Sequence, residues 1–415
     1  MDILRITTAG SVDDGKSTLI GRLLYDTRSI ANDKLEAIEA ASKRKGLNFT
    51  DLSLLTDGLI AEREQGITID VAHIYFSTPG RKYIIADSPG HVEYTRNMIT
   101  GASNASVSLV LIDARKGVIE QTKRHFYIAS LLRIKSVVVC INKMDLVQYD
   151  ESVYETIRRD FELIVKKAGF EGQQIKFIPL AAKEGDNIVF PSVKMPWYTG
   201  ETLLEFLENT ATEENNNAAP ARFPVQYVVR PHSDAFHDFR GYAGKVESGF
   251  FRKGEEVLIL PSLKSSIIKD IFFYDEAKEV AAAKESVVIT LEEEVDVSRG
   301  NMLVKCPDVF KQSGELKATI CWMDETPGTT GKIYLLQHGS NRVKAKLMKV
   351  NTILNIHTLD TQADKKSFQL NDIGEVELKL ARPIFADSYE ANAANGNFIL
   401  IDEFSNNTVA AGFVR

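Results

Sequence analysis

A glycine-rich loop near the amino terminus constrains the fold of this chain more than any other segment. The loop reads Gly10-Ser11-Val12-Asp13-Asp14-Gly15-Lys16-Ser17 and fits the pattern G-x-x-x-x-G-K-[S/T]. An apolar run at residues 3–6 comes before it, and apolar residues at helical spacing follow between positions 19 and 24. A strand, a tight loop and a helix start in this order present backbone N–H groups to phosphate. The sequence therefore predicts a phosphate-binding loop at the edge of an α/β domain.

The composition excludes several classes of protein. A length of 415 residues favours two or three domains. No apolar run is long enough to span a bilayer and the amino terminus lacks a signal pattern, so we expect a cytoplasmic protein with no membrane contact. Cys140, Cys306 and Cys321 lie far apart, which favours reduced core residues. A net charge of −7 provides no general attraction to nucleic acid, and no nucleic acid partner is expected.

Residues 1–212 alternate strand-like and helix-like segments, which is typical of a parallel sheet with helices on both faces. The predicted strands are 3–8, 72–77, 83–87, 108–113, 136–142 and 176–180. Helices are predicted after the loop and around 91–100, 120–132, 151–168 and 202–208. The site residues discussed below follow the carboxyl ends of predicted strands, where open α/β sheets bind ligands.

The second half of the chain has a different pattern. Residues 211–220 are polar and aperiodic, which predicts a linker at 213–221. Short β-branched runs separated by glycine follow, and a break near 306–314 divides them into predicted domains at 222–308 and 309–415. The predicted fold class is an α/β P-loop domain with a doubly wound, mostly parallel sheet, followed by two all-β barrels.

Three segments suit the phosphates of a nucleotide and its Mg²⁺ ion. Lys16 is expected to reach the β- and γ-phosphates, and the Ser17 hydroxyl to bind Mg²⁺. In Asp87-Ser88-Pro89-Gly90-His91, Asp87 is expected to hold Mg²⁺ through water, and the Gly90 N–H to donate to the γ-phosphate. Thr68, after the polar turn at 62–67, is expected to contact both Mg²⁺ and the γ-phosphate when its loop closes. Because these contacts need the γ-phosphate, both loops are predicted to be released on hydrolysis.

The string Asn142-Lys143-Met144-Asp145 selects the base. A carboxylate at Asp145 can accept from N1–H and from the exocyclic amine of guanine, whereas adenine offers no such pair of donors. Lys143 is predicted to lie along the base, and Asn142 to tie the loops together. The turn Ala181-Ala182-Lys183 is predicted to close the pocket with a backbone N–H to guanine O6. The predicted ligands are therefore GTP and Mg²⁺.

A histidine in the phosphate-sensing turn is the candidate for hydrolysis. A lone histidine is more often structural, but His91 directly follows the Asp-x-x-Gly turn and is predicted to orient the attacking water. Val12 and Ile67 form a candidate apolar gate for it. Such a site works by positioning and charge, so slow intrinsic hydrolysis is expected.

Taken together, the motifs predict three sets of site residues. The predicted catalytic residues are His91, Lys16 and Thr68, and the predicted metal ligands are Ser17, Thr68 and Asp87. The predicted nucleotide contacts are Gly10, Ser11, Val12, Asp13, Asp14, Gly15, Lys16, Ser17, Thr18, Asp87, Ser88, Pro89, Gly90, His91, Asn142, Lys143, Asp145, Ala181, Ala182 and Lys183.

These motifs resemble translational-type GTPases of the elongation factor Tu class. Longer strings narrow the resemblance to the large, GTP-hydrolysing subunit of bacterial sulfate adenylyltransferase, over essentially the whole chain. The strings that carry it are Gly10 to Thr27, Asp57-Gly58-Leu59, Tyr94-Thr95-Arg96-Asn97-Met98, Asp113-Ala114-Arg115-Lys116-Gly117, Gly185-Asp186-Asn187, Met195-Pro196-Trp197-Tyr198, Arg240-Gly241-Tyr242-Ala243-Gly244 and Ser298-Arg299-Gly300.

The resemblance implies a heteromeric enzyme of sulfate assimilation. A smaller catalytic subunit would join ATP and sulfate into adenosine 5′-phosphosulfate and pyrophosphate, and this chain would couple GTP hydrolysis to that transfer. Two departures from the family are visible. Ala181 stands where serine is usual, and the stretch 392–396 lacks a usual arginine.

Two alternatives remain open. The first is an elongation factor-like GTPase that carries aminoacyl-tRNA. Against it, the β-rich half shows no cluster of basic and aromatic residues, and the loop reads Val-Asp-Asp instead of Val-Asp-His. The second is a self-contained adenylyltransferase, which would need an ATP site of its own. The chain contains neither a His-x-x-His nor a Ser-Gly-Gly-x-Asp-Ser string.

Overall fold

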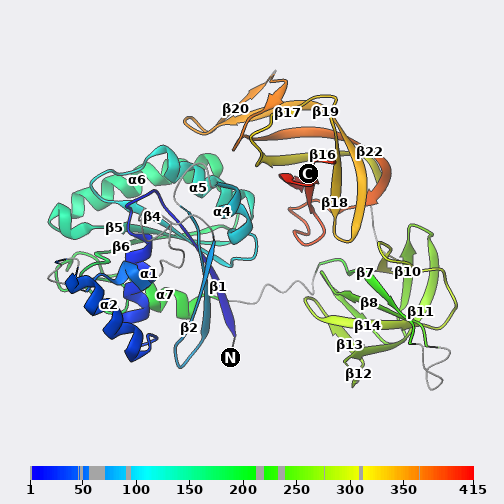
Figure 1. Ribbon diagram of the computed structural model, residues 1–415, viewed down its shortest axis with the longest axis horizontal. Coiled ribbons are helices and arrows are strands. Elements are labelled where there is room, and N and C mark those ends of the chain that lie inside the picture. The colour runs from blue at the N-terminus through cyan, green and yellow to red at the C-terminus, as the bar shows by residue number, and fades with distance from the viewer. Residues whose placement is uncertain are drawn as a thin grey trace. The chain divides into compact units, whose positions relative to one another are not determined.

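The computed structural model describes residues 2–44, 46, 50–55, 71–89, 95–211, 219–231, 239–274, 276–307, 312–363 and 365–415 (Figure 1). These residues form two compact units, and each is described by itself. Unit 1 comprises Met1–Glu213 with Asn355–Asp360, and unit 2 comprises Glu214–Leu354 with Thr361–Arg415. None of the described helices combines the length and the apolar character needed to cross a membrane.

Unit 1 is built on one six-stranded sheet with the order β2-β3-β1-β4-β5-β6. All neighbours are parallel except β2 and β3. The central strands β4 and β5 are buried at every position, as expected for strands covered on both faces. The strands are β1 (Ile3–Ala9), β2 (Ala72–Ser77), β3 (Lys82–Asp87), β4 (Val107–Asp113), β5 (Ser136–Asn142) and β6 (Gln174–Pro179).

Helices cover both faces of this sheet, with α4, α5 and α6 on one side and α1 and α7 on the other (Figure 1). Local signals set where they begin: Asp150 accepts from the Ser152 N–H at the start of α6, and Thr202 and Glu205 form a capping box at the start of α7. The helices are α1 (Lys16–Asp26), α2 (Asn32–Arg44), α4 (Thr95–Ala102), α5 (Glu120–Leu131), α6 (Glu151–Ala168) and α7 (Leu203–Asn209), with 3₁₀ turns η1 (Leu52–Leu55) and η3 (Met144–Val147).

Unit 2 contains two antiparallel barrels. In barrel II the strands run β10-β15-β7-β8-β14-β11, and pairing between β10 and β11 closes the ring. Strand β12 extends β11, and β9 pairs with β13. The strands are β7 (Arg222–Val229), β8 (Gly241–Lys245), β9 (Phe250–Arg252), β10 (Glu256–Leu260), β11 (Lys264–Phe273), β12 (Glu276–Lys278), β13 (Val280–Ala282), β14 (Ser286–Leu291) and β15 (Met302–Lys305).

Barrel III closes in the same way, with the order β18-β23-β24-β16-β22-β19 and a pairing between β18 and β19. Its strands are β16 (Gln312–Trp322), β17 (Gly328–Thr329), β18 (Ile333–His338), β19 (Asn341–Asn355), β20 (Asp360–Ala363), β21 (Ser367–Phe368), β22 (Ile373–Phe385), β23 (Asn397–Ile401) and β24 (Thr408–Val414). The predicted fold class, a doubly wound α/β domain followed by two all-β barrels, is therefore confirmed.

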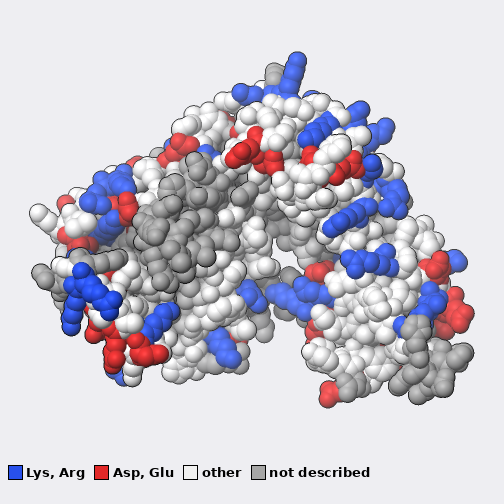
Figure 2. Space-filling view, in the orientation of Figure 1, with Lys and Arg blue, Asp and Glu red and all other residues white. Residues whose placement is uncertain are grey.

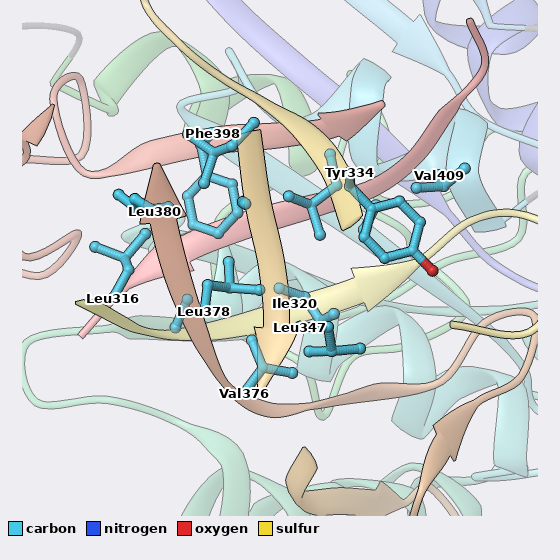
Figure 3. Packing of buried hydrophobic residues seen from close by; sticks show 14 of the residues in the cluster. Leu316, Ile320, Tyr334, Leu347, Val376, Leu378, Leu380, Phe398 and Val409 are labelled. Atoms are coloured by element: carbon cyan, nitrogen blue, oxygen red, sulfur yellow. The ribbon is translucent and has the colours of Figure 1, made fainter. Parts of the chain in front are cut away.

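The core of barrel III follows from alternation along its strands. Every second residue of β19 from Val343 to Leu347 is buried, and the residues between them are exposed. The inward side chains meet those of the other strands in one apolar cluster (Figure 3). Trp322 is the largest of them, with its ring centroid 5.6 Å from that of Tyr334 in an edge-to-face arrangement. Closure of the barrel thus leaves this cluster without a solvent-facing side.

A buried ion pair joins the two barrels. The Arg222 side chain on β7 is 2% exposed, and its Nε and Nη2 donate to the two carboxylate oxygens of Asp387 at 3.0 and 2.9 Å. The side-chain amides of Asn392 and Asn395 also donate to Asp387, and Asn392 donates to Ser248 Oγ as well. The guanidinium and carboxylate therefore satisfy each other inside the protein, where an unpaired charge is costly.

Asp387→Ala tests how much the ion pair between Arg222 and Asp387 contributes to stability. It leaves the Arg222 guanidinium buried without its carboxylate, so the free energy of unfolding of unit 2 should fall by about 3–5 kcal/mol. Urea unfolding followed by Trp322 fluorescence, in a Trp197→Phe background, measures the change. The matched control is Asp270→Ala, which removes the partly exposed ion pair with Lys253 and should alter the unfolding curve far less. Equal losses in the two variants would contradict a special role for the buried pair.

Candidate functional site

The phosphate-binding loop is shaped by two residues in the left-handed region. Asp13 has φ 66° and Gly15 has φ 94°, and α1 begins directly after Gly15. Gly15 also lies against Asn142, because a Cβ atom at this position would lie 2.4 Å from the Asn142 Nδ2 atom. Only glycine satisfies both the backbone angle and this close approach. The loop therefore turns tightly onto the end of β5, as the motif predicts.

Lys16 is already folded back over the loop. Its Nζ donates to the carbonyl oxygens of Gly10 and Ser11 at 2.8 and 3.2 Å, and the side chain is buried. Burial lowers the pKa of Lys16, while the nearby carboxylates of Asp87 and Asp14 act in the opposite direction. The ammonium group is thus held over the mouth of the loop, where a phosphate would meet it.

Asp87 ends β3 and lies next to the loop because β3 is paired with β1. Thr8 is opposite Asp87 in the register and donates its hydroxyl to Asp87 Oδ1 at 2.6 Å. Ser88 follows in a fully buried position, with its Oγ 3.3 Å from Thr7 Oγ1. A carboxylate and the Ser17 hydroxyl are hard oxygen donors of the kind that Mg²⁺ prefers. The described residues at this end of the sheet therefore fit a magnesium ion.

Asn142, the last residue of β5, connects three loops. Its Nδ2 donates to the Asp14 carbonyl at 2.8 Å, and its Oδ1 accepts from the Ala182 N–H at 3.0 Å. The Met144 N–H donates to the Leu180 carbonyl at 3.0 Å, which ties the same loop to the end of β6. These bonds bring the phosphate-binding loop, the Asn142–Asp145 string and the turn at 181–183 together. The position of Asn142 agrees with the tying role predicted from the sequence.

Lys143 adds a further link between the same loops. It adopts a left-handed conformation, with φ 64°, and its Nζ donates to the Asp13 carbonyl. The same nitrogen lies 3.0 Å from the Asp113 carboxylate at the end of β4. Burial raises the pKa of Asp113, but hydrogen bonds from Arg115 and Lys143 outweigh it and hold that pKa well below its usual range. Asp113 is therefore an anion between two cations.

Asp14 gives the loop an internal carboxylate. Its Oδ2 accepts from the Ser11 N–H at 2.7 Å, and Lys116 Nζ lies 3.9 Å from its Oδ1. The side chain is only 2% exposed, and burial is the main cause that raises the pKa of Asp14. This carboxylate closes the first turn of the loop from inside.

The turn at 181–183 closes the opposite side of the site. Ala181 and Ala182 are buried, whereas Lys183 is exposed and its carbonyl accepts from Arg22 Nη1 at 3.3 Å. Asp145 is half-buried within η3. The Ala181 carbonyl accepts from the Glu184 and Gly185 N–H groups at 3.0 and 2.8 Å, so backbone hydrogen bonds hold this turn without a hydroxyl at position 181.

The structure thus brings the predicted residues of the loop at 10–18, of 87–89, of 142–145 and of 181–183 to one end of the sheet in unit 1. Thr68, Gly90 and His91 lie outside the described residues, and so does Ile67, so their roles stay predictions. Sequence reasoning assigned no role to Asp113, Arg115, Thr8 or Arg22. Residues 113–117 contribute to the resemblance only as one of the matching strings. The sequence feature that points to Asp113 is its position at the end of the predicted strand 108–113.

Comparison with protein families gives two matches. The model described as "Elongation factor Tu GTP binding domain" matches residues 1–213, and the "GTP-eEF1A C-terminal domain-like" model matches residues 315–415. The first match covers the whole α/β part of the chain, and the second lies in barrel III.

Several curated proteins are similar over the full length. The chain is 47% identical to "Sulfate adenylyltransferase subunit 1" of Saccharophagus degradans and covers 87% of that protein, and 48% identical to the protein of the same name in Cellvibrio japonicus, of which it covers 86%. It is 45% identical to "Bifunctional enzyme CysN/CysC" of Mycobacterium tuberculosis, of which it covers 67%. Each alignment spans 99–100% of this chain. The chain therefore belongs to the sulfate adenylyltransferase subunit 1 family, and its first 213 residues are a GTP-binding domain of the elongation factor Tu type.

Proposed function

We propose that this chain is the GTP-hydrolysing subunit of a heteromeric sulfate adenylyltransferase. A smaller subunit binds ATP and sulfate and forms adenosine 5′-phosphosulfate and pyrophosphate. Hydrolysis of GTP on this chain drives that unfavourable adenylyl transfer. The names of the relatives support the sulfate part of the proposal, since two of the three are called subunit 1 of this enzyme.

The observation that carries the GTP part is the double contact of Asn142. One buried amide holds the phosphate-binding loop through Asp14 and the base-side turn through Ala182. The phosphate-binding loop and the base-side turn are therefore fixed relative to each other before a nucleotide binds to both. Preorganisation of this kind lowers the entropic cost of binding.

In this mechanism the protein binds and orients, and no covalent intermediate with the protein forms. Lys16 and the loop N–H groups neutralise the charge on the β- and γ-phosphates as the terminal P–O bond breaks. Ser17, Thr68 and Asp87 would hold Mg²⁺, which when bound supplies positive charge to the phosphate oxygens. Asp145 accepts from the guanine edge, with Lys143 along the base and the turn at 181–183 behind it.

An elongation factor-like carrier of aminoacyl-tRNA is the second candidate, and one observation favours it. Exposed basic side chains alternate along β19, and Lys346 lies opposite Lys379 on β22. Figure 2 shows Lys and Arg side chains gathered at the edge of barrel III. The exposed basic residues on these two strands are Arg342, Lys344, Lys346, Lys349, Lys379 and Arg382. A basic strip attracts phosphates but does not distinguish RNA from an acidic protein surface.

Sulfate-dependent release of pyrophosphate from ATP tests the proposal. A tag on this chain recovers it with its partners from its own cell extract, and release is measured with and without GTP. We expect release to require both a co-purifying smaller subunit and GTP. Lys16→Ala should reduce the GTP-dependent part at least about a hundredfold, because it removes a cation that neutralises the transferring phosphate.

The control for this experiment is Lys166→Ala, which removes an exposed lysine on α6 and should leave release unchanged. Co-purification of charged tRNA without pyrophosphate release would establish the translation-factor alternative instead. Release by the chain alone would show that it carries an ATP site of its own.

His91→Ala tests the proposed orientation of the attacking water. The variant should bind GTP with unchanged affinity and hydrolyse it about a hundredfold more slowly, the usual size of a lost proton-transfer or water-positioning group. Single-turnover hydrolysis of radiolabelled GTP in the assembled enzyme measures the rate. An unchanged rate would remove His91 from the mechanism.

Asp145→Asn tests recognition of the base. The amide no longer accepts from both guanine donors but can pair with the carbonyl of xanthine. GTP affinity should therefore fall about a hundredfold, and XTP should become the better ligand. Equilibrium titration with fluorescent nucleotides measures both affinities. The matched control is Asp150→Asn, because asparagine also caps helices well. A retained preference for GTP in Asp145→Asn would refute the assignment.

A further inference from the structure

Asp113 is the last residue of β4, and its side chain is fully buried. In the parallel register it lies beside Asn142, the residue that opens the base-recognition string on β5. The carboxylate is therefore placed where the phosphate-binding loop and the base loop approach each other. No role for Asp113 follows from the GTP-site motifs themselves.

Four donors converge on this one carboxylate. The Arg115 backbone N–H and Nε each donate to Oδ1 at 3.0 Å, and Arg115 Nη2 donates to Oδ2 at 2.6 Å. Lys143 Nζ reaches the same Oδ2 at 3.0 Å. A bidentate guanidinium with a lysine beside it is a strong, directional arrangement. The carboxylate is thereby held in one orientation from the Arg115 side while Lys143 approaches it from the other.

Lys143 is the point at which this network reaches the nucleotide site. Its Nζ donates to the Asp13 carbonyl while it pairs with Asp113. These two contacts anchor the ammonium group, and the side chain is only 22% exposed. A flexible four-carbon side chain fixed at its end has few rotamers left, which would keep its stem in place along the base of a bound guanine nucleotide.

We propose that Asp113 is a positioning residue that locks Lys143 between β4 and the phosphate-binding loop, and so slows the release of guanine nucleotides. The inference rests on the guanine-nucleotide site in the proposed function and adds the residue that sets how long the nucleotide stays bound. Arg115 is the outer support, because its guanidinium holds the carboxylate that holds the lysine. GDP and GTP are affected alike, since the network meets the base loop at Lys143 and the phosphate-binding loop at Asp13, and both loops serve either nucleotide.

Asp113→Asn keeps the shape of the side chain and removes its charge. We expect release of both fluorescently labelled GDP and labelled GTP to become about tenfold faster, because the amide lacks the negative charge that pairs with both cations and turns its NH2 group toward one of them. The KM for GTP should rise by a similar factor, whereas kcat at saturating GTP should stay unchanged. A merely structural role would instead lower the melting temperature and kcat without this split.

Arg115→Gln is the second variant, in case the buried substitution prevents folding. It should give a smaller effect in the same direction, about threefold, since the Asp113–Lys143 pair survives without its support. The control is Arg158→Gln on α6, because Arg158 is 43% exposed and Arg115 47%, and Arg158 pairs with the carboxylates of Glu155 and Glu162. Its release rates should match those of the unaltered protein.

The measurement uses the purified full chain with labelled nucleotide, so it does not depend on sulfate activation. Unchanged release in a folded Asp113→Asn variant overturns the inference and leaves the proposed function standing. A faster release of GDP but not GTP also overturns it, because the base-side contact is common to both. Failure of the unaltered chain to bind guanine nucleotides would instead refute the GTP part of the proposed function.

Discussion

The nucleotide site of unit 1 depends on one buried amide. Asn142 is 1% exposed and contacts Asp14 with its donor end and Ala182 with its acceptor end. These two residues follow different strands, so a single side chain fixes the distance between loops that the chain separates by more than a hundred positions. The close approach also explains Gly15, where any side chain would collide with this amide. The sheet supplies the platform, and the amide sets the spacing of the loops on it.

Much of the fold could be predicted because its signals are local. Strands β2 and β5 and helix α6 have the predicted bounds, since apolar runs and the cap at Asp150 mark where they begin and end. Helix α2 was not predicted, because only Ile38 and Ser42 on it are buried and its apolar stripe is too weak to detect. The sequence predicts that each β domain is a barrel, but not which strands pair to close it. No local pattern encodes that order of strands around the ring.

Part of the candidate site could likewise be predicted from local sequence motifs, and part could not. Loops with fixed glycine, lysine and asparagine spacings were located from the sequence, and the described parts of them meet at one end of the sheet. The part played by Asp113 was not foreseen, because it depends on the register that sets Asp113 beside Asn142 and on the left-handed backbone of Lys143. Thr68 and His91 remain predictions, since they lie outside the described residues.

The junction between Arg222 and Asp387 has a consequence for how such a chain can evolve. Each barrel carries one half of a buried charge pair, and the amides of Asn392 and Asn395 donate to its carboxylate. Recombination that replaced one barrel with that of a distant relative would inherit a guanidinium or a carboxylate without its counterpart. The two barrels should therefore be inherited as a single module, and exchange between lineages should fall at the boundary between unit 1 and unit 2.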